Sequence, residues 1–537
     1  MVRGKILCGG KSDFERVQKG VGEYFFEMAQ KHQEKIFQID GRTKEEETYS
    51  SVHQRSIRLA SHLQKLGVTP DDIVVTCLKM TMDTVIPHIA TTYLGAKFAA
   101  LDIIQTEKDW THCIGLVKPK LVFVDEDHLR KIEKCLKSLG IEPIIIVDGK
   151  SDCHTVFADL MKPSVEDVTF SPQIVEECHA TAAIFFSSGT TGLPKAMCLS
   201  HFSFINKTIS YFTMDICNPK VILAYSSFYW ITGMEILTRM FFSGGCRIIA
   251  PSFHPEEAIR MIEEFKVTYC IINPACLKSI IDLDNATKYD TSSLHHLSTG
   301  GSPVKPNDLL DMRKLFKHSH VTIGYGCSET AGILTCFDFT RDRDVLDNVK
   351  SVGRCMKEVE IKVVDDLTRQ PLGPNQDGEI WVRTPYLMNG YLNDETPSRL
   401  DEEGFLKTGD RGYYDADECF YIVGRSDDIF KYGVVKVDPD RWESVLAEHP
   451  AVREVGVFGI PHGSDGYLPA ACIVLKDNVD ATEKGIEDFF IGKMTLEHRI
   501  AGGIKFVDSL PRTPTAKLKR CELIELFNRT TPNQAEQ

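Results

Sequence analysis

One stretch constrains the fold most, residues 182–195 with the sequence AAIFFSSGTTGLPK. The apolar run from Ala182 to Phe186 predicts a buried strand. It leads into a loop of glycines and hydroxyl-bearing residues that ends at Lys195. Glycines let backbone amides approach a ligand closely, and amides, hydroxyls and a lysine are the donors that a polyphosphate needs. We therefore predict a strand followed by a phosphate-binding loop, in preference to an ordinary Ser/Gly surface turn.

The loop differs from a Walker A motif, in which Gly-Lys is followed by Ser or Thr. Here Lys195 follows Pro194 and precedes Ala196. This order disfavours an ordinary P-loop kinase or ATPase.

The bulk composition excludes several classes of protein. A chain of 537 residues exceeds the ~250–300 residues that one core organises, so we expect more than one domain. Its net charge of −14 argues against a nucleic-acid binder. Seventeen scattered cysteines without zinc spacing indicate reduced thiols and an intracellular protein. The N-terminus is too polar for a signal peptide, and Glu235, Arg239 and Arg247 interrupt the longest apolar region, so no transmembrane helix is predicted.

The order of predicted elements indicates an α/β fold. Helical and strand patterns alternate over residues 20–160, which favours a mostly parallel sheet with helices on its faces. From about Gly353 short strands predict an antiparallel sheet or small barrel, and a small α+β domain is expected from about Arg425. The main predicted helices are 48–66, 85–94, a helix from 201 capped by Ser200, 440–449 and 489–498, and the main strands are 73–77, 121–124, 143–147, 197–199, 269–272, 321–325, 359–364, 379–383, 420–423, 452–459, 471–475 and 505–507.

Other segments carry candidate functional groups. Two Gly-rich turns, 298–303 and 324–330, follow predicted strands, and ligands collect beyond the carboxyl ends of strands in open α/β sheets. Glu329 there is either a solvated glutamate or a ligand for Mg²⁺ beside a triphosphate. Asp410 is either a turn residue that bonds its own backbone or an acceptor for a ribose diol. The aromatic residues 228–230 fit core packing and a pocket wall equally well.

Five motifs then appear along the chain: SSGTTGLPK (187–195), STGGSP (298–303), GYGCSET (324–330), TGD (408–410) and LPRTPTAK (510–517). In this order they resemble the adenylate-forming superfamily, which includes acyl-CoA synthetases, 4-coumarate-CoA ligases and firefly luciferases. The resemblance covers nearly the whole chain. It implies a large N-terminal domain, residues 1–424, with sheets, helices and a small barrel-like subdomain. It also implies a small mobile C-terminal domain, residues 425–537, that swings about Asp427.

The resemblance also implies a reaction. A fatty or aromatic carboxylic acid would react with ATP to give an acyl-adenylate and pyrophosphate, and the acyl group would then pass to the thiol of coenzyme A. Mg²⁺ and Lys517 would neutralise the charge that concentrates as the two anions approach.

The resemblance further assigns roles by motif position. The ATP phosphates would be held by Ser187, Ser188, Gly189, Thr190, Thr191, Gly192 and Lys195. Adenine would lie against Gly301, Ser302 and Tyr325, and the ribose against Asp410 and Arg425. Ser328 and Glu329 would serve the phosphates and Mg²⁺. The acyl pocket would include Tyr229, Trp230, Gly300 and Gly326, and the thioester step would involve Lys431 and Gly433.

The sequence departs from the family pattern at three places. Trp230 replaces a common histidine, which would shorten the acyl pocket and argues, with Gly332, against luciferin oxidation. Val434 follows Gly433 where pantetheine would pass, which predicts a slower thioester step. Ala516 replaces the glycine before Lys517, a minor stiffening.

Two alternative functions stay open: a luciferase-like oxygenase that uses the same adenylation, and a non-catalytic relative. The joint presence of Lys195, Glu329, Asp410, Arg425 and Lys517 argues against the second. The cytosol or the peroxisome is expected, the latter from the resemblance alone because the Ser-Lys-Leu ending is absent.

Overall fold

The computed structural model describes most of the chain: residues 5–12, 14–163, 165–188, 194–212, 220–302, 304–338, 342, 348–393, 399–425, 428, 430–432, 435–462, 466–477, 479–494, 499–512 and 518–529. The chain forms two compact units. The large unit comprises Leu7–Glu360 and Arg383–Arg399, and the small unit comprises Met1–Ile6, Ile361–Val382 and Leu400–Gln537. Each unit is described by itself.

The first sheet of the large unit has the strand order β20-β10-β9-β5-β4-β6-β7-β8. Strands β9 to β8 in this order pair in parallel, whereas β10 and β20 are antiparallel additions at one edge. This arrangement confirms the mostly parallel sheet. The strands are β20 (Gly390–Tyr391), β10 (Pro194–Ser200), β9 (Thr181–Ser188), β5 (Lys97–Ala100), β4 (Ile73–Cys77), β6 (Leu121–Asp125), β7 (Ile144–Asp148) and β8 (Thr155–Val156).

The second sheet of the large unit has the order β17-β16-β15-β14-β13-β11-β12-β2-β3. Its central strands, β15 to β2, are parallel, and its edge strands are antiparallel. The strands are β17 (Arg354–Cys355), β16 (Gly332–Cys336), β15 (His320–Cys327), β14 (His296–Gly300), β13 (Tyr269–Ile271), β11 (Val221–Ala224), β12 (Cys246–Ile249), β2 (Ile36–Asp40) and β3 (Glu46–Thr48).

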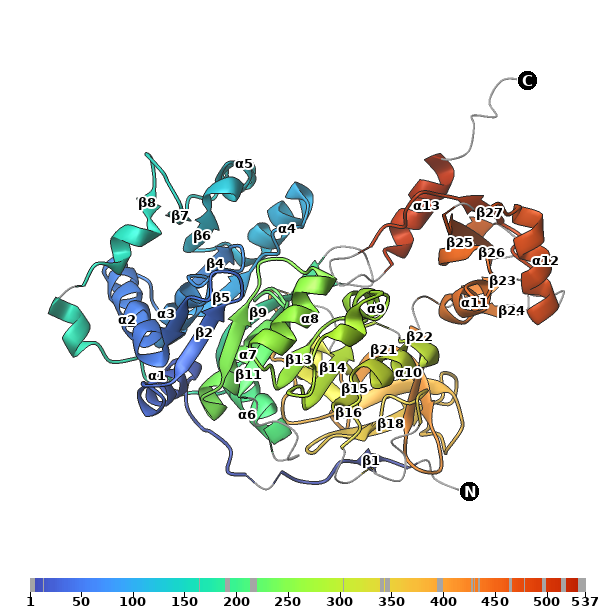
Figure 1. Cartoon of the computed structure of the whole chain (residues 1–537), viewed down its shortest axis with the longest axis horizontal. Coiled ribbons are helices and arrows are strands. Elements are labelled where there is room, and N and C mark those ends of the chain that lie inside the picture. The colour runs from blue at the N-terminus through green and yellow to red at the C-terminus, as the bar shows by residue number, and fades with distance from the viewer. Residues whose placement is uncertain are drawn as a thin grey trace. The chain divides into compact units, whose positions relative to one another are not determined.

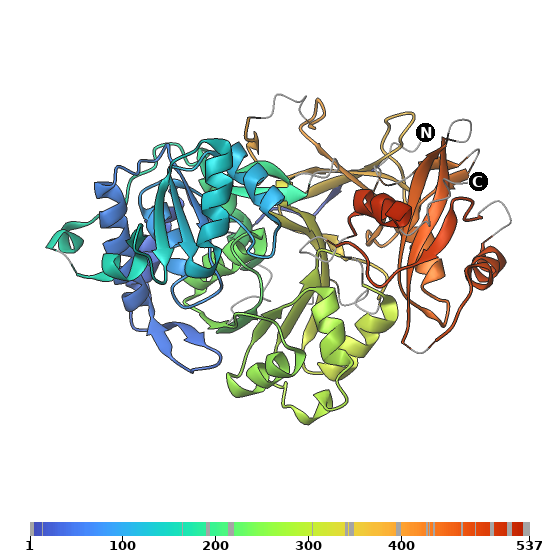
Figure 2. The same cartoon turned by 90° about the horizontal axis from the view of Figure 1, so that it is seen from above.

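Helices of the large unit form two groups. The main core takes apolar side chains from both sheets and from the first group. A second core joins the other face of the second sheet to the second group, which gathers on one side of that sheet in Figures 1 and 2. The first group is α1 (Val21–Lys31), α2 (Tyr49–Lys65), α3 (Val85–Tyr93), α4 (Glu107–Val117), α5 (Leu129–Leu139), α6 (His201–Phe212) and α7 (Ile231–Ser243), and the second is α8 (Pro255–Glu264), α9 (Pro274–Ile281) and α10 (Pro306–Leu315).

Local sequence signals explain where several helices begin. The Thr48 side chain accepts a hydrogen bond from the Ser51 amide and caps α2, and the Ser203 amide donates to Ser200 Oγ at 3.0 Å, as predicted for the start of α6. Such N-caps stabilise a helix by ~0.5–2 kcal/mol. The cap at Thr482, whose side chain accepts from the Gly485 amide, was missed.

That cap corrects one predicted helix. Helix α12 spans Glu483–Lys493, so it begins earlier than the predicted 489–498. Met494 leaves helical geometry, with φ −102° and ψ −118°, and residues 495–498 lie outside the described part of the chain.

The small unit contains two sheets. Strands β18 (Glu360–Val364), β19 (Gly378–Arg383), β21 (Leu406–Tyr414) and β22 (Phe420–Arg425) are neighbours in that order, which confirms the predicted short antiparallel strands. The other sheet has the order β24-β23-β26-β25, with β27 beside β26. Its elements are β23 (Phe430–Tyr432), β24 (Val435–Val437), β25 (Val452–His462), β26 (Gly466–Leu475) and β27 (Gly503–Phe506), with helices α11 (Pro439–Leu446), α12 and α13 (Arg520–Arg529).

The division into units differs from the predicted boundary after residue 424. Chain contacts continue across this position, since β21 pairs with β22 up to Arg425 and α11 contacts β22. A Cβ at Gly424 would lie 3.0 Å from Asp440 Oδ2. The boundary after residue 424 stays a prediction.

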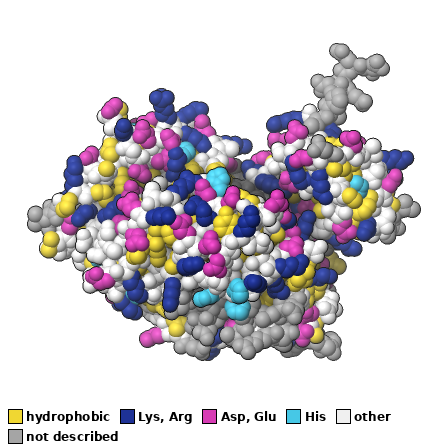
Figure 3. Space-filling model, viewed as in Figure 1, with side chains coloured by type: hydrophobic (Ala, Val, Ile, Leu, Met, Phe, Trp, Pro, Cys, Tyr) yellow, Lys and Arg dark blue, Asp and Glu magenta, His cyan; other side chains and the backbone are white. Residues whose placement is uncertain are grey.

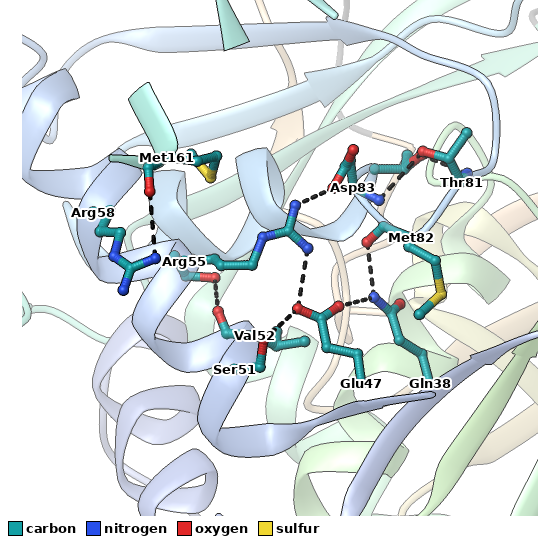
Figure 4. Close-up of polar contacts among 12 residues, drawn as sticks. Gln38, Glu47, Ser51, Val52, Arg55, Arg58, Thr81, Met82, Asp83 and Met161 are labelled. Atoms are coloured by element: carbon teal, nitrogen blue, oxygen red, sulfur yellow. Dashed lines mark hydrogen bonds and ion pairs between the residues drawn. The ribbon is translucent and has the colours of Figure 1, made fainter. Parts of the chain in front are cut away.

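A buried polar network fastens the second sheet of the large unit to its helices (Figure 4). Gln38 Nε2 donates to Glu47 Oε2 at 2.6 Å and to the Met82 carbonyl at 2.7 Å. Glu47 also accepts from Arg55 Nη1 at 3.0 Å. In the sequence Arg247 only interrupts an apolar region. In the structure it is buried and donates to Gln38 Oε1 at 2.7 Å.

Charged side chains of both signs are interspersed on the face seen in Figure 3. Among the described residues drawn there, no continuous basic stripe of the kind that binds nucleic acid is visible. In the described part of the chain, every helix is too short or too polar to cross a bilayer.

Candidate active site

The predicted phosphate-binding stretch forms an antiparallel hairpin. Strand β9 is buried as expected, and β10 begins directly at Pro194. Ser187 and Lys195 are direct cross-strand partners. Ser188 ends β9, although its side chain is not described, and Gly189, Thr190, Thr191 and Gly192 lie outside the described residues. The strand prediction is confirmed, and the loop contacts stay predictions.

Helix α4 fixes the end of this hairpin. His112 Nε2 lies 2.8 Å from the Pro194 carbonyl oxygen, and because a carbonyl oxygen only accepts, the imidazole donates an N–H to it from Nε2. This contact joins the start of β10, next to Lys195, to helix α4.

A short turn presents Glu329. Ser328 to Thr330 form a single 3₁₀ turn after β15, and Ala331 closes it in the left-handed conformation with φ 57°. The buried Thr330 hydroxyl donates to the Cys327 carbonyl at 3.0 Å, and the Met388 amide donates to the Glu329 carbonyl at 2.9 Å. The backbone on both sides of Glu329 is therefore held in place.

Tyr391 brings the hairpin and the turn together. Its hydroxyl donates to Glu329 Oε1 at 2.8 Å, and Lys195 Nζ lies 5.0 Å from its ring centroid. Burial raises the pKa of Tyr391 well above the usual tyrosine value, and the neighbouring Glu329 adds to the rise. Three residues that the family resemblance assigns to ATP, Ser187, Lys195 and Glu329, thus meet around a tyrosine that sequence reasoning missed.

The Gly-rich turn after β14 has an open side. Gly301 has φ +82°, a conformation that favours glycine, and a Cβ there would meet no atom within 4 Å. Its neighbours Ser302 and Tyr325 are partly buried. The predicted contact of these residues with adenine stays a prediction.

Two glycines predicted for the acyl pocket have another structural reason. A Cβ at Gly300 would lie 2.6 Å from the Gly324 carbonyl oxygen, and one at Gly326 would lie 2.2 Å from that of Gly332. Close approach of neighbouring strands therefore already requires glycine at both positions. Their contribution to a pocket stays a prediction.

The two aromatic residues before α7 differ in exposure: Tyr229 is buried and Trp230 is half-buried. Tyr229 is 6% exposed, and its hydroxyl accepts from Gln105 Nε2 at 3.1 Å. Its ring stacks on Phe186 and meets Trp230 edge-on at 4.7 Å. Trp230 also makes a side-chain hydrogen bond with Asp102, whose pKa is raised by burial and partly lowered by this bond.

A cavity of about 10 Å³ lies against the start of α7, with room for about one water molecule. It is lined by Leu199, Phe204, Thr208, Ile231, Met234, Glu235 and Ala331. Glu235 forms a buried ion pair with Arg239 at 2.8 Å. The buried Lys207 lies close by, and burial lowers its pKa to about 8. The sequence shows Glu235 and Arg239 as interruptions of an apolar region but does not reveal that these charges and Lys207 are buried, because a charged residue inside a helical apolar pattern gives no signal of burial.

The predicted ribose pair lies in the small unit. Arg425 Nη1 is 3.1 Å from Asp410 Oδ1, and the two residues are cross-strand partners on β21 and β22. The interpretation of Asp410 as a turn residue is wrong, because Asp410 lies within strand β21, which begins at Leu406. The Asp410 amide donates to Thr408 Oγ1 at 3.0 Å, which orders the start of the motif.

The remaining candidates are only partly described. Lys517, Asp427 and Gly433 lie outside the described residues, and Lys431 lies in β23 without a described side chain. The two ends of the segment that carries Lys517 are paired: Arg512 bridges to Leu518, and the Lys519 amide donates to the Pro511 carbonyl at 3.0 Å.

Arg520 anchors the next element. Its guanidinium contacts Asp428 at 3.2 Å and also pairs with Asp440 and Glu443. Burial raises the pKa of Glu443 to about 7, against the lowering effect of Arg520. The start of α13 is therefore joined to α11 and to the segment beside Asp427.

The groups around Tyr391 fit Mg²⁺ and a polyphosphate. Mg²⁺ prefers one or two carboxylates together with phosphate and water oxygens. Glu329 supplies one carboxylate with a fixed backbone, Lys195 a cation and Ser187 a hydroxyl, all from partly buried positions.

Comparisons with known proteins match most of the chain to one enzyme family. The family described as AMP-binding enzyme matches residues 25–392, and the AMP-binding enzyme C-terminal domain matches residues 441–517. A luciferin 4-monooxygenase of Photinus pyralis is 31% identical over 89% of each chain. The 4-coumarate–CoA ligase 1 of Petroselinum crispum is 28% identical over 93% of this chain and 92% of its own.

A solved structure is also similar to this chain. The luciferase-like enzyme from the nonluminescent mealworm Zophobas morio is 39% identical, with a TM-score of 0.76 over 79% of this chain and 100% of its own.

Proposed function

Because this chain belongs to the AMP-binding enzyme family of adenylate-forming enzymes, we propose that it is an acid–thiol ligase. It activates a fatty or aromatic carboxylic acid with ATP and transfers the acyl group to coenzyme A. The observation that carries this proposal is the meeting of Lys195 and Glu329 at Tyr391. Similarity to 4-coumarate–CoA ligases over most of the chain supports the choice of thiol acceptor.

In this proposal each residue binds a different part of the substrates. Lys195 and the 187–192 loop neutralise the phosphates, and the Asp410 carboxylate accepts hydrogen bonds from the ribose hydroxyls while Arg425 orients it. Glu329 holds Mg²⁺, which would supply Lewis-acid stabilisation of charge on the phosphate oxygens. Lys517 donates to the oxygens between the acid and the α-phosphate, where charge develops.

The domain arrangement belongs to the same proposal. Residues 425–537 form a mobile domain that swings about Asp427. Closure brings Lys517 to the acid and excludes water from a hydrolysable mixed anhydride. In the second step Lys431 and Gly433 face the thiol. Trp230, held by an edge-on contact with the Tyr229 ring and by a hydrogen bond with Asp102, limits the length of the acid.

A second candidate function is a luciferase-like oxygenase. It is favoured by one observation, the greater identity to luciferin 4-monooxygenases than to 4-coumarate–CoA ligases. Both candidates share adenylation, so they differ only in the fate of the acyl-adenylate. The bulk of Trp230 favours the ligase.

The experiment is a two-stage assay of the purified chain. Pyrophosphate release is measured with ATP, Mg²⁺ and a panel of fatty and aromatic acids, and products with and without coenzyme A are then separated by chromatography. A thioester that depends on coenzyme A supports the ligase. Oxygen uptake and light with luciferin, without a thioester, would support the oxygenase, and no pyrophosphate with any acid would exclude both.

A further inference from the structure

Tyr391 lies outside the five sequence motifs, yet it occupies a fixed place beside them. It belongs to the short edge strand β20, where it pairs with Met197 of β10. The amides on either side hold this strand: Asn389 donates to the Cys198 carbonyl at 2.9 Å and Leu392 to the Ala196 carbonyl at 2.7 Å. The backbone of Tyr391 is therefore anchored to the hairpin that carries Lys195.

The strand register puts three side chains on one face of the sheet. Ser187 is directly opposite Lys195, and directly opposite residues in an antiparallel pair share a face. Met197 lies two residues after Lys195 and so points to the same side. Tyr391, opposite Met197, therefore joins Ser187 and Lys195 on that face.

The hydroxyl of Tyr391 contacts a carboxylate, and its ring contacts an ammonium group. Its hydroxyl donates to Glu329 Oε1 at 2.8 Å, and Ser187 adds a side-chain hydrogen bond. The face of its ring is 5.0 Å from Lys195 Nζ, within the range of a cation–π contact. A phenylalanine would keep the ring contact and lose the hydroxyl, and a leucine would lose both.

We propose that Tyr391 is a positioning residue of the nucleotide site: its hydroxyl orients the Glu329 carboxylate, and its ring holds the Lys195 ammonium. The inference rests on the proposed function of those two residues. It assigns a separate function to each part of the side chain: the hydroxyl orients the proposed metal ligand Glu329, and the ring contacts the proposed phosphate-binding cation Lys195.

The plain structural alternative is that Tyr391 only packs against the core, where it is a partly buried neighbour of the main cluster. Packing alone predicts equal behaviour of tyrosine and phenylalanine. Tyr391→Phe removes only the hydroxyl oxygen and therefore distinguishes a positioning role from packing.

The test compares Tyr391→Phe and Tyr391→Leu with a matched control, Tyr421→Phe. Tyr421 also donates its hydroxyl to a carboxylate, Asp415 Oδ2, at 2.7 Å, but it belongs to the small unit and has no proposed role. Binding of ATP to the full chain is followed by displacement of a fluorescent ATP analogue, with and without Mg²⁺. Steady-state pyrophosphate release then gives kcat and the KM for ATP.

Loss of a partner that orients a metal ligand commonly costs ~10–100-fold in metal affinity. We expect Tyr391→Phe to raise the Mg²⁺ concentration at half-maximal ATP binding about 10-fold and to leave Mg²⁺-free ATP binding unchanged. Tyr391→Leu should also weaken Mg²⁺-free ATP binding, by about 3- to 10-fold, through loss of the cation–π contact. Tyr421→Phe should match the wild type in both measurements.

A Tyr391→Phe titration that superimposes on the wild-type Mg²⁺ curve would overturn the inference, as would an equal change in Tyr421→Phe. Binding is measured without turnover. A wild-type protein that binds Mg²⁺ and ATP but releases no pyrophosphate therefore contradicts the proposed ligase, while the binding curves still decide the role of Tyr391.

Discussion

Asp410 and Arg425 face each other across β21 and β22, with Arg425 Nη1 3.1 Å from Asp410 Oδ1. Asp410 is buried, and a buried carboxylate is costly without a partner. The guanidinium therefore holds this carboxylate in place before any ligand arrives. A fixed acceptor is suited to a diol, whose two hydroxyls can donate to one carboxylate.

Asp410→Asn should raise the KM for ATP about 10-fold and change kcat little. Hydrogen bonds to a charged group contribute ~1.5–3 kcal/mol, and the amide keeps the shape but loses the charge. The measurement is pyrophosphate release over a range of ATP concentrations. Asp401→Asn is the control, because Asp401 pairs with the buried Lys362 at 2.7 Å in the same unit without a proposed ligand. An unchanged KM in Asp410→Asn would remove the ribose assignment.

The Asp410–Arg425 pair also shows how much of the candidate site can be predicted from the sequence. The Thr408–Asp410 motif was identified, but a Thr-Gly-Asp run is typical of turns, and only the register between β21 and β22 places Asp410 opposite Arg425. Strand β9 and helix α2 were predictable because their apolar periodicity and caps are local. Such local signals carry no information about which strands become neighbours.

Tyr391 illustrates the same limit within the candidate site. Its neighbour Gly390 has φ +124°, and a Gly-Tyr pair gives no sign of a carboxylate 62 residues earlier in the chain. Lys195 and Glu329 were found because each belongs to a Gly-rich turn after a strand. Their shared partner lies on an edge strand of two residues, too short for any periodicity.

Lys517→Ala should reduce acyl-adenylate formation ~10²–10³-fold, as expected for loss of one preorganised donor, with ATP binding nearly unchanged. The fold should tolerate the change, since the ends of this segment are joined between Arg512 and Leu518. Lys519→Ala is the control, because Lys519 pairs with Glu522 at 3.0 Å. Single-turnover assays with labelled acid give the rate, and full activity of Lys517→Ala would refute the assignment.

Trp230→Ala should shift acid preference toward longer or bulkier chains. The indole meets the buried Tyr229 ring at 4.7 Å, so its removal opens space next to that ring. The measurement is the ratio of kcat/KM for a long and a medium-chain acid, with Trp230→Phe as an intermediate case. The same ratio in all three proteins would show that Trp230 serves packing alone.

The buried histidine of α3 makes stability depend on pH. His88 Nδ1 lies 2.9 Å from the Thr84 carbonyl, and burial lowers the pKa of His88 to about 4. The folded state therefore holds a neutral imidazole, while the unfolded chain takes up a proton below pH ~6.5. The resulting stability is complete above pH ~6.5 and is lost as the pH falls toward 4.

Denaturant unfolding of the wild type should lose about 2 kcal/mol from this group between pH 7.5 and 5. His53 and His201, whose pKa values burial also lowers to about 4, act in the same direction. His88→Gln should be less stable at pH 7.5 but should lose less stability on acidification. A His88→Gln protein with the full wild-type pH dependence would contradict the prediction.

The proposed transfer to coenzyme A involves residues 433–434, one of the places where the sequence departs from the family pattern. Tyr432 of β23 pairs with Val435 of β24, and the two residues between them in the sequence, Gly433 and Val434, lie outside the described part of the chain. If pantetheine passes here as we propose, a valine in place of glycine restricts both the backbone and the space beside it. Thioester formation should therefore be slower than adenylation, and acyl-adenylate should accumulate transiently.

Rapid-quench analysis with labelled acid should show a burst of acyl-adenylate before steady thioester production. Val434→Gly should shrink the burst by speeding transfer to coenzyme A, whereas Val437→Ala, at a buried core position of β24, controls for a general loss of stability. Lys431→Ala should enlarge the burst, since it removes the cation that the proposal assigns to the thiol-transfer step. If no acyl-adenylate accumulates in the wild type and Val434→Gly behaves identically, the departure is neutral, and transfer to coenzyme A is as fast as activation.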